Sequence, residues 1–70
     1  MTDSHTASYT VTGMTCGHCV ASVTEEVQAI PGVTDVQVDL ASGALSITSS
    51  RTIDDDAVRA AVDEAGYQLA

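Results

Sequence analysis

The chain has 70 residues, enough for one small domain, and a domain of this size buries only about 60% of the surface that its unfolded chain exposes. Apolar residues make up 44% of the sequence, and with two Tyr and no Phe or Trp they predict a tight aliphatic core without a deep pocket for an organic substrate. Two Lys and Arg residues against ten Asp and Glu residues give a formal net charge of −8, which argues against nucleic acid or an anionic membrane surface as a partner and favours a basic or neutral one.

Residues 1–6 are predicted to form a polar N-terminal tail of a single domain that spans residues 1–70. The tail lacks the charged and then apolar pattern of a signal peptide, and no apolar run approaches the length of a membrane span. The predicted location is therefore the cytoplasm, without direct insertion into a membrane. His5 is expected to be mobile in the tail, with no role beyond weak metal affinity.

The residues after the tail alternate in character and then change to a helical period. Residues 7–12 place Tyr9 and Val11 on one face, which predicts a half-buried strand that ends at Gly13. From residue 17 the apolar residues recur at spacings of three and four, which predicts an amphipathic helix that stops at Pro31 and Gly32. Its apolar stripe consists of Val20, Val23, Val27 and Ile30.

The second half of the chain repeats the change from strand to helix. Residues 33–40 and the residues after 43 alternate around a short turn, which predicts a hairpin. Its inward residues are expected to be Val36, Val38, Leu40, Leu45 and Ile47. A second helix is predicted to start at the N-cap Asp54, with Ile53 and Val58 as a hydrophobic staple, and to end at a left-handed Gly66. Its inner stripe is Val58, Ala61, Val62 and Ala65, and residues 67–69 form a brief last strand.

The acidic run Asp54–Asp56 is interpreted as a charged helix start rather than a hard-cation site, because adjacent carboxylates on a helix point in different directions.

The predicted order of strand, helix, strand, strand, helix and strand belongs to the α+β class. It is the βαββαβ order of a ferredoxin-like sandwich, in which two helices cover one face of a four-stranded antiparallel sheet. In this arrangement the loop after the first strand and the loop before the last strand emerge at the same edge. Tyr67 is therefore expected to lie close to that first loop.

Both cysteines lie in the stretch Gly13-Met14-Thr15-Cys16-Gly17-His18-Cys19, where the strand pattern gives way to the helix pattern. Two thiols separated by two residues can turn toward one point, and a position in the first helical turn favours the thiolate of Cys19. A soft, anionic, two-sulfur site suits Cu(I) better than Ca²⁺, Mg²⁺ or Mn²⁺, which prefer oxygen. Zn²⁺ is a weaker candidate because its closed sites take four ligands, and a structural disulfide is disfavoured in a reducing compartment.

Three neighbours are predicted to support or tune this pair. Met14 is either a thioether ligand or an apolar plug, and the plug is favoured because Met fills irregular gaps well. His18 offers one nitrogen, but its side chain is expected to point to solvent. When protonated it would lower the cysteine pKa values and offset the charge of a bis-thiolate Cu(I) centre. Tyr67 is expected to pack over the site and to shield the thiolates.

The motif GMTCGHC, followed by a Val-rich helix, PGV, an alternating hairpin and a late AGY, resembles the heavy-metal-associated domain family from about Tyr9 to Ala70. That family includes small copper chaperones and the N-terminal metal-binding domains of copper-exporting P-type ATPases. The resemblance implies a protein that is not an enzyme, in which Cys16 and Cys19 hold Cu(I) and pass it by ligand exchange to such an ATPase.

By the same resemblance, a Tyr at the position of Tyr67 is typical of bacterial chaperones. Together with Met1 and a chain that ends where the fold ends, it favours a free-standing bacterial copper chaperone. Two alternatives stay open: an isolated metal-binding domain of an ATPase, and a storage or sensor module. A homodimer that is bridged by copper is a possible further state.

A rival from another class is a thiol-disulfide oxidoreductase, because Cys-Gly-His-Cys also matches the active-site tetrapeptide of protein disulfide isomerases. Those enzymes use a larger thioredoxin-like domain, an aromatic residue before the first cysteine and a cis-proline that faces the pair. Here Thr15 precedes Cys16, and the one proline of the chain, Pro31, follows a helix. The oxidoreductase is therefore the weaker interpretation.

Overall fold

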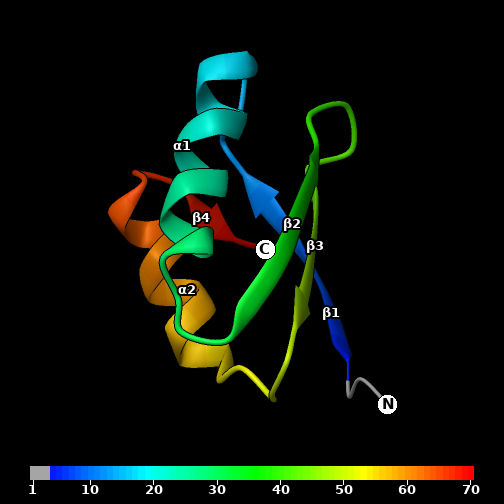
Figure 1. Cartoon of the computed structure of the whole chain (residues 1–70). Helices are drawn as coiled ribbons and strands as arrows, with labels where there is room; N and C mark the ends of the chain where they lie inside the picture. The colour runs from blue at the N-terminus through cyan, green and yellow to red at the C-terminus, as the bar shows by residue number, and fades with distance from the viewer. Residues whose placement is uncertain (1–3) are drawn as a thin grey trace.

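Two helices and four strands make up the structure, a computed structural model that describes residues 4–70 (Figure 1). In chain order they are β1 (His5–Thr12), α1 (Gly17–Gln28), β2 (Val33–Asp39), β3 (Ala44–Ser49), α2 (Asp55–Glu64) and β4 (Gln68–Leu69). The strands form one antiparallel sheet in the order β2-β3-β1-β4, and both helices lie on the same face of it (Figure 1). The predicted ferredoxin-like βαββαβ arrangement is thus confirmed.

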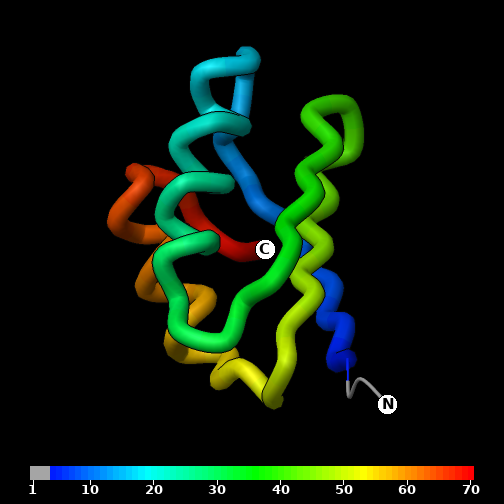
Figure 2. The backbone as a smooth tube through the Cα atoms, viewed as in Figure 1, coloured from blue at the N-terminus to red at the C-terminus, as the bar shows by residue number. Residues whose placement is uncertain are grey.

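The connections divide between two ends of the molecule (Figure 2). The loop between β1 and α1 and the β2–β3 turn lie at one end, and the α1–β2 and β3–α2 connections lie at the other. The cysteine loop therefore stands at the opposite end from the proline that follows α1.

Neither helix in residues 4–70 is long and apolar enough to cross a membrane.

The core lies between the sheet and the helices and is aliphatic, as the composition predicts. The apolar residues of the predicted strand faces and helix stripes supply it, because alternation on a strand and a 3.6-residue period on a helix each turn one face inward. Its buried members are Val11, Val23, Val27, Val36, Leu45, Ile47, Val58, Ala61 and Val62. The inner stripe predicted for α2 is thereby confirmed.

Two boundaries predicted from the sequence are wrong. β1 begins at His5 rather than at residue 7, because β3 continues to Ser49 and offers a pairing partner to His5. The exposed polar side chains at this end of β1 carry no alternation that would reveal the strand. His5 is thus part of the sheet rather than of a mobile tail, and residues 1–3 of the predicted tail lie outside the described residues.

The second correction concerns Leu40, which is 39% exposed instead of inward. β2 ends at Asp39, where the carbonyl of Asp39 accepts the Gly43 N–H at 2.8 Å and its carboxylate accepts the Ala41 N–H at 3.1 Å. The turn thus replaces the strand before Leu40 is reached, and the alternation no longer decides where that side chain points.

Candidate metal centre

The cysteine loop leads from the end of β1 into the first turn of α1. Cys16 is the N-cap of α1, with extended backbone angles (φ −157°, ψ 174°), and its carbonyl accepts the Cys19 N–H at 3.0 Å. Cys19 is thus the third residue of the helix, as predicted. The first turn of α1 contains no acidic residue, so the thiols are the groups that can place negative charge at this helix start.

The two sulfurs face one another. The Sγ atoms of Cys16 and Cys19 are 3.6 Å apart, and both thiols are free. In residues 4–70, no three His, Cys, Asp or Glu side chains come together as a group that could hold a metal ion. The donor set that this part of the chain offers is therefore a pair of sulfurs, which suits a soft ion of low coordination number better than a four-ligand zinc site.

The two cysteines have different surroundings. Cys16 is exposed, whereas Cys19 is only 7% exposed. The Cys19 Sγ accepts the backbone N–H of Thr15 at an N···S distance of 3.5 Å, and the Thr15 hydroxyl lies 3.9 Å from the same sulfur. One sulfur is thus held by the fold, and the other is open to an approaching molecule.

These contacts lower the pKa of Cys19 from 9.0 to about 6. The largest cause is the hydrogen bond from the Thr15 backbone, followed by one from the Tyr67 side chain, while burial acts in the opposite direction. Hydrogen bonds from the backbone and side chain of Cys16 contribute less. Since hydrogen bonds to the charged form favour it, Cys19 is a thiolate at neutral pH.

The end of α2 places Tyr67 beside this thiolate. Gly66 has a left-handed backbone (φ +92°), as predicted, and the Tyr67 N–H bonds the Val62 carbonyl at 3.0 Å in a Schellman ending. The Tyr67 ring packs on the cysteine loop, where a Cβ at Gly13 would lie 3.5 Å from the ring. Hydrogen bonding to Cys19 in turn raises the pKa of Tyr67. The predicted proximity of Tyr67 to the pair is confirmed, and its shielding role stays a prediction.

Met14 and His18 lie in different environments. Met14 is half-buried and packs against the hydrophobic core, as expected of an apolar plug. His18 is exposed on α1 between the cysteines, and it is not among the groups that lower the pKa of Cys19. The tuning role of His18 therefore stays a prediction.

The contact between Thr15 and the sulfur of Cys19 was not predicted from the sequence. The main contribution of Thr15 to the site is a backbone N–H, which every residue except proline carries, so the residue type leaves no signal for it. Its position directly before the first cysteine is the one cue that the sequence offers.

The features that an oxidoreductase of the thioredoxin type requires do not occur in residues 4–70. The sheet is ferredoxin-like, every described peptide bond is trans, and Pro31 lies in the α1–β2 connection at the far end of the molecule (Figure 2).

Known proteins resemble this chain in sequence and in fold. The family model described as Heavy-metal-associated domain matches residues 8–68. Copper-transporting ATPase 2 of Rhizobium meliloti (strain 1021) is 43% identical over 60 residues, which are 84% of this chain and 7% of the ATPase. The COP-associated protein of Helicobacter felis is 36% identical over 59 residues, which are 84% of this chain and 89% of that protein.

A solved structure is also close. The CopZ metallochaperone has a TM-score of 0.87 and 28% identity, over 94% of this chain and 100% of that chain. The chain thus spans a small part of its ATPase relative but nearly the whole length of the small relatives that it matches.

Proposed function

The chain belongs to the heavy-metal-associated domain family, and from this membership we propose that it is a cytoplasmic copper chaperone that binds Cu(I) through Cys16 and Cys19. It is a copper-chaperone-like domain, similar both to small chaperones and to the metal-binding part of copper ATPases. Carriage of the ion is the role that we propose, and a role as one module of a transporter is the alternative.

One observation carries the proposal: two sulfurs lie 3.6 Å apart, one of them buried and the other exposed. Hydrogen bonds also lower the pKa of the buried thiol, Cys19, to about 6. The thiolate of Cys19 requires no deprotonation at neutral pH before it can bind a metal ion. A soft ligand pair of this kind matches the preference of Cu(I) for sulfur and for few ligands.

Delivery would follow by ligand exchange. A cysteine thiolate of the partner would form a third Cu–S bond at the exposed side of the site and release one of the two cysteines, and a second partner thiolate would then replace the other. The partner that fits is the metal-binding domain of a copper-transporting P-type ATPase, since this chain resembles that part of such proteins. The net charge of −8 favours a basic or neutral docking surface on it.

The binding part of this proposal is tested by metal titration under reducing, anaerobic conditions with Cu(I), Zn²⁺ and a competing chelator. We expect tight binding of Cu(I) and weaker binding of Zn²⁺, because two sulfurs fill a Cu(I) site but only half of a closed zinc site. Tighter binding of Zn²⁺ than of Cu(I) would overturn it.

The delivery part requires a second experiment with the copper-loaded chain and a purified metal-binding domain of a copper ATPase. We expect copper to distribute between the two proteins soon after mixing. Retention of all copper on this chain would contradict delivery and favour storage. Association of two copies only when copper is present, measured by sedimentation, would support the copper-bridged homodimer as a further state.

A further inference from the structure

One large apolar side chain is exposed in the part of the chain that the structure describes. It belongs to Leu40, which is 39% exposed in the β2–β3 turn and is not a member of the aliphatic core cluster. A single exposed leucine is ordinary on a protein surface, so its place in the fold decides what it can do.

Leu40 stands at the same end of the molecule as the cysteines. α1 runs away from the cysteine loop and β2 returns beside it, so the residue that follows β2 comes back to that end (Figure 2). The turn is also bonded to the strand that leads into the loop, because the Val11 N–H donates to the Gly43 carbonyl at 2.8 Å. The turn and the cysteine loop are thereby joined two residues before Gly13.

Backbone contacts fix the position of this turn. Gly43 has a left-handed backbone (φ +76°), and a Cβ there would lie 2.6 Å from the Val11 carbonyl oxygen, so the turn and β1 are in close contact. The Ala44 N–H donates to the Ser42 hydroxyl at 3.3 Å. The placement of the turn against β1 therefore does not depend on the side chain of Leu40.

The segments at this end of the molecule lack charged side chains. They are the cysteine loop, residues 13–19, the turn, residues 40–43, and residues 65–67, and none of them contains Asp, Glu, Lys or Arg. Asp39, which precedes the turn, directs its carboxylate to the Ala41 N–H at 3.1 Å. The net charge of −8 is therefore carried outside these three segments.

A partner that takes copper from this chain must cover this end, since its thiolate has to reach the exposed Cys16. A charged side chain of that partner would be removed from water here without an opposite charge to meet, which is unfavourable. An apolar side chain would instead bury the exposed part of Leu40. A second copy of this chain fits less well, because it adds a further net charge of −8.

We propose that Leu40 is a docking residue, which the metal-binding domain of a copper-transporting ATPase buries against an uncharged, apolar surface around its own cysteines. This inference rests on the proposed function and adds the β2–β3 turn to the cysteine loop as a second contact with the partner. Leu40 acts through the contact between the two proteins and not on copper itself. It therefore affects association and transfer but not the affinity for Cu(I).

The test measures the complex of the copper-loaded full chain with a purified metal-binding domain of a copper ATPase, by NMR titration and by the rate of copper transfer. We expect the signals of residues 40–43 and of the cysteine loop to shift, and those of residues 30–32 and 50–53, at the opposite end, to stay. Leu40→Ala should weaken the complex by about three- to tenfold, because the apolar area that the partner buries is lost. Leu40→Met keeps that area and should bind like the parent chain. Chelator competition should give the same Cu(I) affinity for both variants.

Two further variants separate the local surface from the net charge. Leu40→Glu and Gln28→Glu each add one negative charge, the first at the cysteine end and the second at the exposed last residue of α1. We expect Leu40→Glu to weaken the complex by at least about tenfold, since a carboxylate would be buried without a partner, and Gln28→Glu by less than about twofold. Equal effects would show that the overall charge governs docking and would overturn the proposal.

The remaining outcomes distinguish this proposal from delivery itself. Normal transfer by the parent chain, with unchanged binding of Leu40→Ala and Leu40→Glu, would overturn the role of Leu40 and leave delivery intact. A parent chain that transfers no copper would overturn delivery and this proposal with it. Weaker copper-dependent self-association of Leu40→Ala, with unchanged binding to the ATPase domain, would identify a second copy as the occupant and contradict the proposal. Unshifted signals of residues 40–43 would do so even if a variant does not fold.

Discussion

The two helices differ in the side chains that complement the unpaired backbone N–H groups at their starts. α2 begins after Asp54 and carries Asp55 and Asp56 in its first turn, so acidic side chains of the chain itself complement the unpaired N–H groups. α1 begins after Cys16 without an acidic residue in its first turn, and the groups that bring negative charge there are thiols. The dipole of one helix start is thus complemented by carboxylates, and that of the other by thiols.

The same comparison supports the start of α1 as the proposed metal site. An anionic sulfur is favoured at a helix start that has no competing carboxylate, and additional N–H and O–H donors from Thr15 and Tyr67 strengthen the preference. The aspartates of α2, by contrast, contact Tyr9 and Arg59 within the chain. Substitutions at α1 should therefore change metal binding, and substitutions at α2 should change stability.

The largest effect is expected from loss of a sulfur. Cys16→Ser or Cys19→Ser should weaken Cu(I) binding by more than about 100-fold. Loss of a residue that only supports a metal ligand weakens binding by up to about 100-fold, and each cysteine is proposed as a ligand itself. The fold should remain, because neither cysteine belongs to the aliphatic core cluster. Chelator competition measures the affinity and far-ultraviolet circular dichroism the fold. Near-normal affinity in either variant would show that the pair is not the binding site.

The next effect is the dependence on pH. Below pH 6, protons compete with Cu(I) for Cys19. Because binding of Cu(I) must then release one proton from this sulfur, the affinity for Cu(I) should fall about tenfold for each pH unit. Stability follows the same group: a pKa lowered from 9.0 to about 6 stabilises the fold fully above pH 9, and this contribution is lost as the pH falls from 9 to 6.

Thiolate absorbance and Cu(I) competition at several pH values measure these two effects, and the chain unfolded in denaturant provides the control. In the unfolded chain Cys19 should titrate near its ordinary value. A folded chain in which no thiol titrates near pH 6 would contradict the environment described for Cys19.

A smaller effect is expected at Tyr67, where two variants separate the hydroxyl from the ring. Tyr67→Phe removes the hydrogen bond to Cys19 and should raise the pKa of that thiol while the ring still covers the loop. Tyr67→Ala removes both and should also speed copper exchange and copper-dependent association, by up to about tenfold. Identical exchange rates in Tyr67→Ala and the parent chain would rule out a shielding role.

His18→Gln should have a weaker influence still. The substitution removes a positive charge near the pair when the imidazole is protonated, so Cu(I) affinity should fall by about twofold, the scale of an exposed charge interaction. Cysteine titration and chelator competition are again the measurements. An unaltered cysteine titration would exclude electrostatic tuning, and complete loss of copper binding would identify His18 as a ligand.

The smallest effect on copper is expected at the start of α2. Asp56→Ala should lower the free energy of unfolding by about 0.5 kcal/mol, because one charge that complements the helix dipole is lost, and it should leave Cu(I) affinity unchanged. Asp63→Ala, at the opposite end of the same helix, is the matched control and should not destabilise. Denaturant unfolding measures both. A loss of copper affinity in Asp56→Ala would contradict the expectation that the start of α2 affects stability and not metal binding.

The sequence by itself determined the architecture and the location of the site. Strand alternation and helical spacing identify nearly all core residues, because burial of one face is a local periodic property. The two-residue separation of Cys16 and Cys19 at a strand-to-helix change was enough to predict that their sulfurs approach one another. Gly66 likewise marked the end of α2, because a left-handed residue is most easily a glycine.

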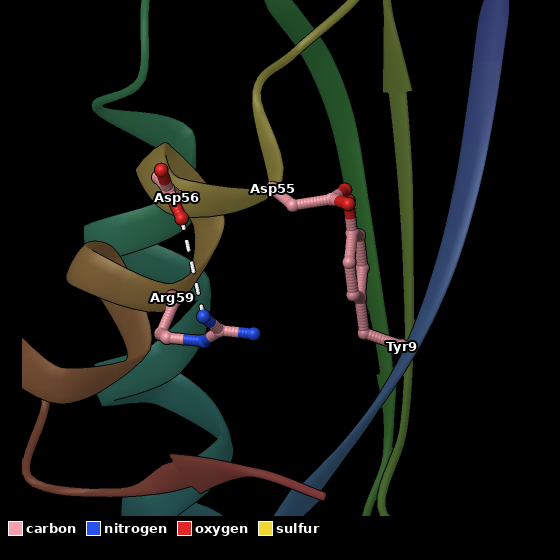
Figure 3. Close-up of polar contacts among 4 residues, drawn as sticks. All are labelled: Tyr9, Asp55, Asp56 and Arg59. Carbon is pink, nitrogen blue, oxygen red and sulfur yellow. Dashed lines mark hydrogen bonds and ion pairs between the residues drawn. The ribbon is translucent and has the colours of Figure 1, made fainter.

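Only the tertiary structure decided how the two cysteines differ and where β1 begins. The pKa of Cys19 depends on a backbone N–H, which has no residue signature, and on Tyr67, which is brought to the loop from the other end of the chain. The early start of β1 depends on β3, and a hydrogen bond joins Tyr9 of β1 to Asp55 of α2, 46 residues apart (Figure 3). Contacts of this range arise from the packing of elements, and a local sequence pattern reports the elements alone.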